Sequence, residues 1–255
     1  LISYIGQDRD FVQKKCSVST TLRVGIQALF GIKQIHDVGF VHRDVKPDNF
    51  AFGHRAGGTD PQVVHLLDFG LSREFVMKDG KTMKNPRRNQ SFRGTNLYAS
   101  ISVLEGNDQG RVDDLWSLMY SMAEIRLGML PWKRDNKIVR KEKKKYYVDS
   151  KLFETFPPII LKLCSYLRTL GNRDRPDYAY IYRVFISAME TGSHKFSDVW
   201  DWEVPGFLPT IPLSWIRAQT PKDNADKSGS KDQAVVGVKV NPFTMDDFSS
   251  NPLGL

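Results

Sequence analysis

Two short strings of residues carry the side chains best suited to chemistry. The first runs from His42 to Asn49 and reads His-Arg-Asp-Val-Lys-Pro-Asp-Asn, and the second is Asp68-Phe69-Gly70, further along the chain. Transfer of a phosphoryl group requires a carboxylate at the attacking hydroxyl, a cation near the transferred phosphate and oxygen ligands for Mg²⁺. The two strings contain all of these groups, so the sequence indicates phosphoryl transfer.

Each polar residue of the two strings has a predicted task. Asp44 would orient the attacking hydroxyl and accept its proton, and Lys46 would neutralise charge on the transferred group. Asn49 and Asp68 would hold the metal ions, and Lys46, Asp48, Asn49 and Asp68 together would bind the nucleotide. A His-Arg-Asp string alone could be an ordinary polar loop, but the complete ordered set favours the catalytic interpretation.

Helical and extended segments must bring the two strings together. Apolar residues recur at helical spacing from Ser19 to Val38, which predicts a buried helix that ends around Gly39. Extended pieces at 50–52 and 63–67 predict a small β-ribbon between the strings. Residues 71–100 are polar and basic without periodicity, so we expect a long functional loop there.

Helices are predicted for most of the remaining domain, at residues 112–127, 158–170 and 178–189. From about Arg217 onward, Lys, Asp, Ser, Gly and Asn dominate, and this composition predicts a disordered tail that docks through Phe243 or Phe248.

The positive charge of the chain is concentrated locally. The 255 residues carry a formal charge of +8, and Lys and Arg cluster in residues 72–93 and 133–151, which suggests a localised anionic partner. The run from Arg140 to Lys145 is expected to be a solvated helix face. Trp200 and Trp202 are expected to pack against the core rather than to bind a ligand.

The remaining composition narrows the cellular setting. No stretch approaches the roughly 18 apolar residues that a membrane span needs, so no membrane partner is expected. Cys16 and Cys164 stand far apart, which fits two ordinary buried thiols in a reducing compartment such as the cytoplasm or the nucleus.

With the two strings and the ribbon between them, the chain resembles the protein kinase superfamily over about residues 1–203. The resemblance implies ATP and Mg²⁺ as cofactors and proteins as substrates. Residues 92–102 stand where most kinases carry Ala-Pro-Glu, and this replacement resembles the casein kinase one group. Further motifs follow in the order seen in tau-tubulin kinases: Asp113 to Leu118, Leu130 to Trp132, Arg175 to Tyr178, and Asp201 to Glu203.

The resemblance also implies roles for residues outside the two strings. Thr95 would hydrogen-bond toward Asp44 and Lys46, which suggests specificity for serine and threonine, although it could be a plain turn residue. Asp114 would anchor the backbone of the first string. An anion, either an acidic residue or a phosphate already present on the substrate, would bind four arginines, unless their loop is merely solvated: Arg43, Arg87, Arg88 and Arg93.

The resemblance is incomplete at the N-terminus. The residues before His42 contain no Gly-x-Gly-x-x-Gly and no strand lysine of the kind that kinases use to clamp ATP. The expected fold is therefore mainly α, a kinase C-terminal lobe with a small β-ribbon beside the catalytic loop (α+β kinase-like, N-lobe absent). We expect a domain at 1–205, an extension at 206–255, and negligible turnover by the isolated chain.

Two other functions stay open. A pseudokinase scaffold would bind partners without catalysis, although Asp44, Lys46, Asn49 and Asp68 are all present. An adaptor that binds polyanions or microtubules through its basic patches would show salt-sensitive binding independent of Mg-ATP. Because no nucleic-acid motif accompanies these patches, we do not expect a nucleic-acid partner.

Overall fold

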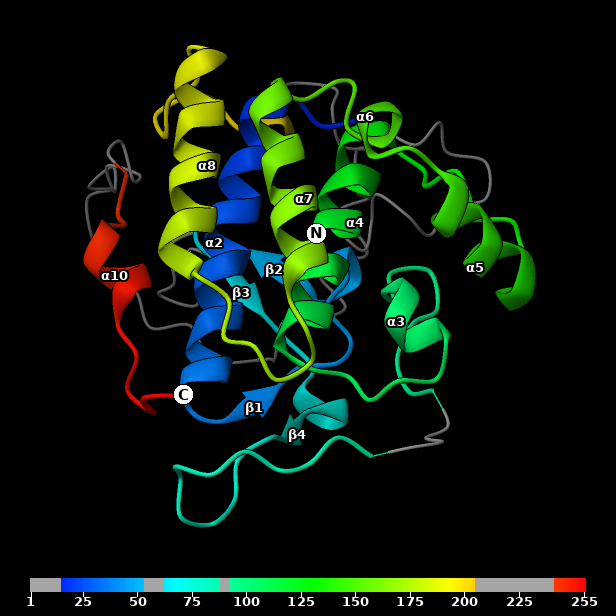
Figure 1. The fold of residues 1–255 in the computed structure, drawn as a ribbon. Helices are drawn as coiled ribbons and strands as arrows, with labels where there is room; N and C mark the ends of the chain where they lie inside the picture. Colours follow the sequence, from blue (N-terminus) through cyan, green and yellow to red (C-terminus); the bar gives the residue numbers. More distant parts are fainter. Residues whose placement is uncertain (1–14, 53–61, 88–91, 205–240) are drawn as a thin grey trace, which may run out of the picture.

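The computed structural model describes residues 15–52, 62–87, 92–204 and 241–255 (Figure 1). About half of them are in α-helices or 3₁₀ turns. The longer helices are α2 (Val18–Asp37), α4 (Arg111–Leu127), α5 (Lys137–Tyr146), α7 (Leu161–Thr169) and α8 (Tyr178–Thr191). The shorter ones are α3 (Ile101–Leu104), α6 (Asp149–Leu152) and α10 (Met245–Ser249), with 3₁₀ turns η1 (Pro47–Asn49), η3 (Phe69–Leu71), η4 (Pro158–Ile160) and η5 (Asp201–Glu203).

Helix α2 forms the centre of the domain. Its N-terminus is capped by the hydroxyl of Ser17, which accepts a hydrogen bond from the Thr20 backbone N–H at 3.1 Å. Its apolar residues pack between α4 and α8 (Figure 1), and Leu22, Ile26 and Leu29 are completely buried. The four predicted helices are confirmed. They correspond to α2, α4, η4 followed by α7, and α8, with ends that agree to within about two residues.

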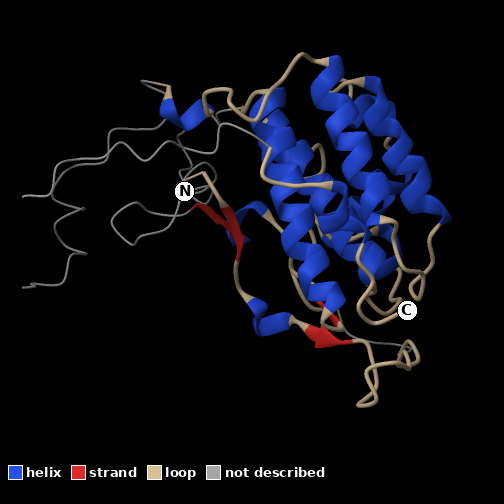
Figure 2. Ribbon diagram, turned by 90° about the vertical axis from the view of Figure 1, so that its left-hand side faces the viewer, coloured by secondary structure: helices blue, strands red, loops and turns tan. Residues whose placement is uncertain are grey.

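Two pairs of short antiparallel strands lie beside the helices (Figure 2). β2 (Phe50–Phe52) pairs with β3 (Val64–Leu66), which confirms the predicted ribbon. β1 (Phe40–Val41) pairs with β4 (Arg73–Glu74), within the region expected to be a loop. The first string lies between β1 and β2 and the second between β3 and β4, so the two strand pairs fix the positions of both strings. Helices and 3₁₀ turns make up about half of the described residues and strands make up few, which is compatible with the predicted α+β architecture.

The predicted disorder of the tail is wrong for residues 241–255. Helix α10 packs against α8 and α2 (Figure 1). Phe248 is completely buried and stacks on Tyr182, with their ring centroids 4.3 Å apart. The polar composition of this segment did not indicate a docked helix. A single buried aromatic side chain is enough to anchor a short helix, and composition does not show such a contact. Residues 205–240 and 1–14 lie outside the described residues.

Trp200 packs into the domain, as expected from the sequence. Its side chain is 2% exposed, stacks on Trp202 and lies under the Arg23 guanidinium, 3.7 Å from the ring centroid. Within the described ranges, no helix combines the length and the apolar character that a membrane crossing requires.

Candidate active site

Asp114 is buried near the start of α4 and accepts hydrogen bonds from the backbone of the first string. Its two carboxylate oxygens accept hydrogen bonds from the backbone N–H groups of His42 at 2.7 Å and Arg43 at 2.8 Å. Arg43 adopts a left-handed backbone conformation with φ of 70°, which costs free energy unless the surroundings enforce it. Asp114 supplies this constraint, so it has the anchoring role predicted for it.

A second support of the loop is His36 on α2, which the sequence analysis did not identify. Its Nε2 lies 2.9 Å from the Asp114 carboxylate and its Nδ1 lies 2.6 Å from the Tyr178 hydroxyl. Burial lowers the pKa of His36 despite the nearby carboxylate. A neutral imidazole therefore donates to Asp114 and accepts from Tyr178. Nothing in the spacing of a lone helical histidine could have indicated this.

The Asp114 carboxylate stays ionised in this buried site. Burial by itself would raise its pKa, but the hydrogen bond from His36 and the neighbouring donors lower it below the ordinary value. The anchor therefore keeps the negative charge that makes its hydrogen bonds to the loop backbone strong.

Three side chains meet at the centre of the site. The Thr95 hydroxyl donates to Oδ1 of Asp44 at 2.8 Å, and the Lys46 ammonium donates to Oδ2 of Asp44 at 2.7 Å and to the Thr95 hydroxyl at 3.0 Å. Asp44 is only 7% exposed. The structure thus brings together the predicted base, the predicted phosphate-neutralising cation and the predicted threonine, and Thr95 is not a plain turn residue.

Gly94 permits this close approach. Its φ is 108°, and a Cβ atom there would overlap the backbone carbonyl oxygen of Arg43. A side chain at position 94 would therefore push Thr95 away from Asp44.

His42 connects the first string to the end of β3. Its Nε2 donates to the backbone carbonyl of Leu67 at 3.0 Å, and its Nδ1 accepts from the backbone N–H of Asp44 at 3.2 Å. The ring therefore fixes the Asp44 backbone relative to the residue that precedes Asp68.

Asn49 and Asp68 are suited to hold Mg²⁺. The Asn49 amide nitrogen donates to the backbone carbonyl of Asp44 at 2.9 Å, so its carbonyl oxygen is the atom left for a metal. The backbone N–H of Leu67 donates to the Asn49 backbone carbonyl at 2.8 Å, so the residue that precedes the exposed Asp68 lies beside Asn49. Oxygen ligands of this kind fit Mg²⁺. Across the described ranges, no group of three or more His, Cys, Asp or Glu could form a metal site.

Asp48 stands apart from this cluster. It is exposed in η1, and among the described residues no hydrogen bond or ion pair joins it to the other predicted nucleotide-binding residues. Its part in nucleotide binding stays a prediction.

The sequence profile of the protein kinase domain matches residues 5–184. The chain belongs to the protein kinase family. This match covers most of the chain and includes both strings, Thr95 and Asp114.

Proteins similar to this chain include three with kinase names. A putative serine/threonine-protein kinase of Caenorhabditis elegans is 36% identical over 260 residues, which cover 100% of this chain and 73% of the relative. A probable serine/threonine-protein kinase of Dictyostelium discoideum is 36% identical over 192 residues, 74% of this chain and 38% of the relative. An inactive tau-tubulin kinase of Caenorhabditis elegans is 36% identical over 198 residues, 75% of this chain and 68% of the relative.

A pocket lined by arginines lies next to the first string, and its cavity volume is about 250 Å³. We call it the arginine pocket. Its four arginines are Arg43, Arg73, Arg87 and Arg93. Burial, and then the charges of the three other arginines, lower the pKa of Arg43, which shows how closely positive charge is gathered here. Three of the four predicted anion-binding residues therefore meet, and Arg88 lies outside the described residues.

Arg73 and Asp108 complete this pocket, and the sequence analysis missed both. One guanidinium nitrogen of Arg73 donates to both Asp108 carboxylate oxygens, at 2.5 and 2.6 Å. The Arg87 backbone N–H donates to Asp108 at 2.9 Å. Although burial opposes it, these contacts lower the pKa of Asp108. One carboxylate therefore orders two of the arginines, and four guanidinium groups still leave the pocket with excess positive charge.

The backbone of the segment that follows Thr95 accepts hydrogen bonds from side chains of α4, α5 and the loop between them. The Trp132 indole N–H donates to the Leu97 carbonyl at 3.0 Å, and the Ser117 hydroxyl donates to the Tyr98 carbonyl at 3.0 Å. Lys144 on α5 donates to the carbonyl of Ala99.

The expectation that residues 140–145 form a solvated helix face is wrong for Lys144. Its side chain is 3% exposed, and its ammonium nitrogen lies over the Tyr120 ring, 4.4 Å from the centroid. Burial, followed by the charge of Arg140, lowers the pKa of Lys144 well below the ordinary value. The sequence could not show that Lys144 differs from its basic neighbours. Only tertiary packing places the Ala99 carbonyl and an aromatic face beside its side chain.

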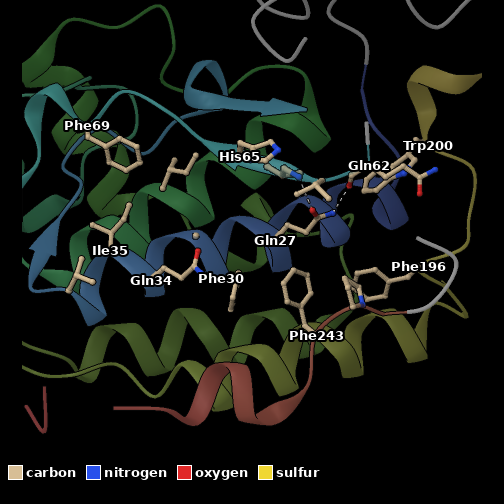
Figure 3. Close-up of a pocket in the computed structure, with 16 residues that line it drawn as sticks. Gln27, Phe30, Gln34, Ile35, Gln62, His65, Phe69, Phe196, Trp200 and Phe243 are labelled. Atoms are coloured by element: carbon tan, nitrogen blue, oxygen red, sulfur yellow. Dashed lines mark hydrogen bonds between the residues drawn. The ribbon is translucent and has the colours of Figure 1, made fainter. Parts of the chain in front are cut away.

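A larger, mainly apolar cavity of about 530 Å³ lies beside α2 and β3 (Figure 3). Phe69 of the second string lies at the opposite end from Trp200, and Phe243 of the C-terminal segment forms part of the wall. Gln27 crosses this region and donates to the Gln62 carbonyl at 3.1 Å. The cavity therefore connects the second string with the C-terminal segment and is separate from the cluster around Asp44.

Proposed function

We propose that this chain carries the catalytic centre of a serine/threonine protein kinase that transfers the γ-phosphoryl group of ATP to hydroxyl groups of proteins. The main support is the hydrogen-bonded set of Asp44, Lys46 and Thr95, since a general base must lie within reach of a hydroxyl and a cation. Thr95 favours serine and threonine substrates over tyrosine because it occupies the place expected from such kinases.

The residues of the site divide the work between them. Asp44 would orient the attacking hydroxyl and take up its proton, while Lys46 would neutralise charge on the transferred group. Asn49 and Asp68 would hold Mg²⁺, which supplies neutralisation of the phosphate charge when it is bound. Asp114 and His36 keep the loop backbone in the conformation that this geometry needs.

We further propose that the arginine pocket selects acidic or already phosphorylated protein substrates. Guanidinium groups suit phosphate and carboxylate because their planar donors can form paired hydrogen bonds. Arg93 stands two residues before Thr95, so an anion bound in this pocket would lie close to the attacking hydroxyl of the same substrate.

The proposed placement within the kinase family is the casein kinase one group, close to tau-tubulin kinases. Two observations support it. Residues 92–102 lack Ala-Pro-Glu, and a relative named as a tau-tubulin kinase aligns with most of the chain.

The 255-residue chain alone is expected to turn over little ATP. No Gly-x-Gly-x-x-Gly occurs anywhere in its sequence, and no strand lysine precedes the first string to hold the α- and β-phosphates. We therefore propose that this chain lacks the kinase N-lobe. Kinase activity is expected from a protein in which the same catalytic residues are combined with a nucleotide clamp.

A pseudokinase scaffold is the second candidate, because the tau-tubulin relative is named as inactive. The two candidates differ in one measurement. A scaffold would bind its partners equally well after Asp44→Asn and would show no phosphate transfer.

The deciding experiment measures transfer of labelled phosphate from ATP to casein and to a tau fragment by the full-length gene product, with and without Asp44→Asn. We expect the variant to lose transfer by at least about a thousandfold, since a base and its alignment are removed together. Equal signals from the wild type and the variant would refute the kinase proposal.

A further inference from the structure

We propose that Ser250 is a phosphorylation site, and that its phosphate is bound by Lys33 and Arg175 and fastens residues 241–255 onto the domain. The proposal rests on the docking of this segment in the structure and does not depend on whether the chain itself is an active kinase.

The C-terminal segment is attached at two points, one on each side of Ser250. On one side, Phe248 is buried against Tyr182 and the edge of Phe30. On the other side, Leu253 and Leu255 pack against a small apolar cluster. Ser250 therefore sits in the connection between two docked apolar anchors, where a new bond to the domain would strengthen both.

Two basic side chains already contact Ser250. The Lys33 ammonium donates to the Ser250 hydroxyl oxygen at 2.6 Å, and a guanidinium nitrogen of Arg175 donates to the Ser250 backbone carbonyl at 2.6 Å. Lys33 is 2% exposed whereas Ser250 is exposed. A phosphate on this hydroxyl would therefore have room toward solvent and a buried cation at its base.

Two cations, Lys33 and Arg175, contact Ser250, and three carboxylates lie in the same region. Lys33 is paired with Asp37 on α2, so Lys33 and Arg175 exceed the facing acidic groups of α2 by one positive charge. Two further carboxylates, Asp246 and Asp247, lie in the first turn of α10, and Asp247 is engaged by the Thr244 backbone N–H at 2.7 Å. A phosphoserine adds about −1.5 to −2 charges and three strong acceptor oxygens, which suits two donors of this kind.

The modification itself is an ordinary phosphoryl transfer from ATP by a protein kinase that favours acidic residues before the acceptor, as Asp246 and Asp247 stand here. A bond forms between the Ser250 hydroxyl oxygen and the γ-phosphorus, and the bond from that phosphorus to the β–γ bridging oxygen breaks. ADP leaves, and the hydroxyl proton goes to the carboxylate base of that kinase.

Fixing residues 241–255 to the domain would also stabilise the support of the first string. Leu253 and Leu255 contact the cluster formed by Val41, Phe75 and Val76. Val41 is the last residue of β1 and directly precedes the first string. A phosphate on Ser250 would therefore hold the support of that strand pair in place.

The test uses the complete chain with phosphoserine encoded at position 250 and follows amide hydrogen exchange in residues 241–255. We expect exchange at the amides around Phe248 to slow by about tenfold or more relative to the unmodified chain, since two charge-assisted hydrogen bonds are added. Phosphoserine at position 249 is the matched control, because the Ser249 hydroxyl faces the Asp246 backbone carbonyl.

The variant Arg175→Gln distinguishes binding of the phosphate from a general effect of charge. It should abolish most of the slowing in the Ser250-phosphorylated chain, with a much smaller effect on the unmodified chain. Unchanged or faster exchange after phosphorylation of Ser250 would overturn the proposal, as would equal slowing from position 249. Because no phosphate transfer by this chain is measured, the result is independent of the kinase proposal.

Discussion

The hydroxyl of Thr95 donates a hydrogen bond of 2.8 Å to the carboxylate of Asp44. This contact joins the catalytic loop to the segment that would lie beneath the substrate. It also leaves the other Asp44 oxygen to Lys46, so removing the hydroxyl should disturb the base without removing it.

If the chain has the proposed kinase activity, Thr95→Val should lower kcat for protein phosphorylation by about tenfold to a hundredfold, because a slightly misplaced base costs this much. Thr95→Ser should restore most of the rate, since it keeps the hydroxyl. Steady-state kinetics provide the measurement, with KM for ATP expected to change little. A Thr95→Val rate equal to that of the wild type would show that the contact has no role in positioning.

Asp114→Asn should destabilise the described domain by about 3 kcal/mol. In the variant an amide NH₂ faces either the Arg43 N–H or both the His42 N–H and His36, so at least one buried donor loses its acceptor. Urea denaturation of the chain followed by circular dichroism measures the free energy of unfolding. Asp246→Asn serves as the control, because Asp246 is exposed on α10; similar losses from both variants would contradict the assignment.

Asp113 should give the fold a measurable pH dependence. Burial raises the pKa of this carboxyl from 3.8 to about 6, against the hydrogen bonds from Gly110 and Ser100. Its contribution to stability is therefore fully present below pH 3.8 and is lost as the pH rises through about 6.

Relative to the wild type, Asp113→Asn should gain stability between about pH 4 and pH 6 and show a constant difference above that range. Denaturation curves at several pH values check this, and the difference between the two proteins cancels the opposing titration of His36. A difference that does not vary with pH would show that Asp113 titrates normally.

Lys144→Met should destabilise the chain by about 1 to 3 kcal/mol, because the carbonyl of Ala99 loses its buried donor while the aliphatic volume is kept. Lys141→Met, on the same helix, is the matched control and should have little effect. Thermal denaturation compares the variants. Reductive methylation should modify Lys141 readily and Lys144 slowly, and rapid modification of Lys144 would show that it is not buried.

Arg93→Gln should weaken binding of a phosphoserine peptide by about tenfold, since one charge-assisted contact is lost. Binding is measured by fluorescence anisotropy without ATP, at low and moderate salt, and the wild type should lose affinity as salt rises. Arg183→Gln on α8 is the control. If the two variants bind equally well, the arginine pocket is not the anion site.

The sequence was most informative where function depends on short contiguous strings. Roles could be predicted for Asp44, Lys46, Asn49 and Asp68 because their order and spacing are specific. The helices could be predicted because their apolar periodicity extends over several turns. Thr95 required the family resemblance, since a single threonine has no chemical signature.

Other features depend on contacts between distant segments. His36, Arg73 and Asp108 are separated in the sequence. They acquire their roles only when α2, β4, the start of α4 and the loop before α4 come together. The strands β1 and β4 have two residues each, which is too short to show an alternating pattern. The sequence predicts Phe248 as a docking residue, but its polar neighbours indicate disorder rather than the short helix that the structure has there.

Gly94 also limits how this protein can diverge. A side chain at that position would overlap the Arg43 carbonyl, and the φ of 108° disfavours every other residue type. Gly106 also has a positive φ, yet a Cβ atom there would meet open space. In a saturation library selected for activity, position 94 should therefore be closed to all replacements, while position 106 should still accept residues such as asparagine.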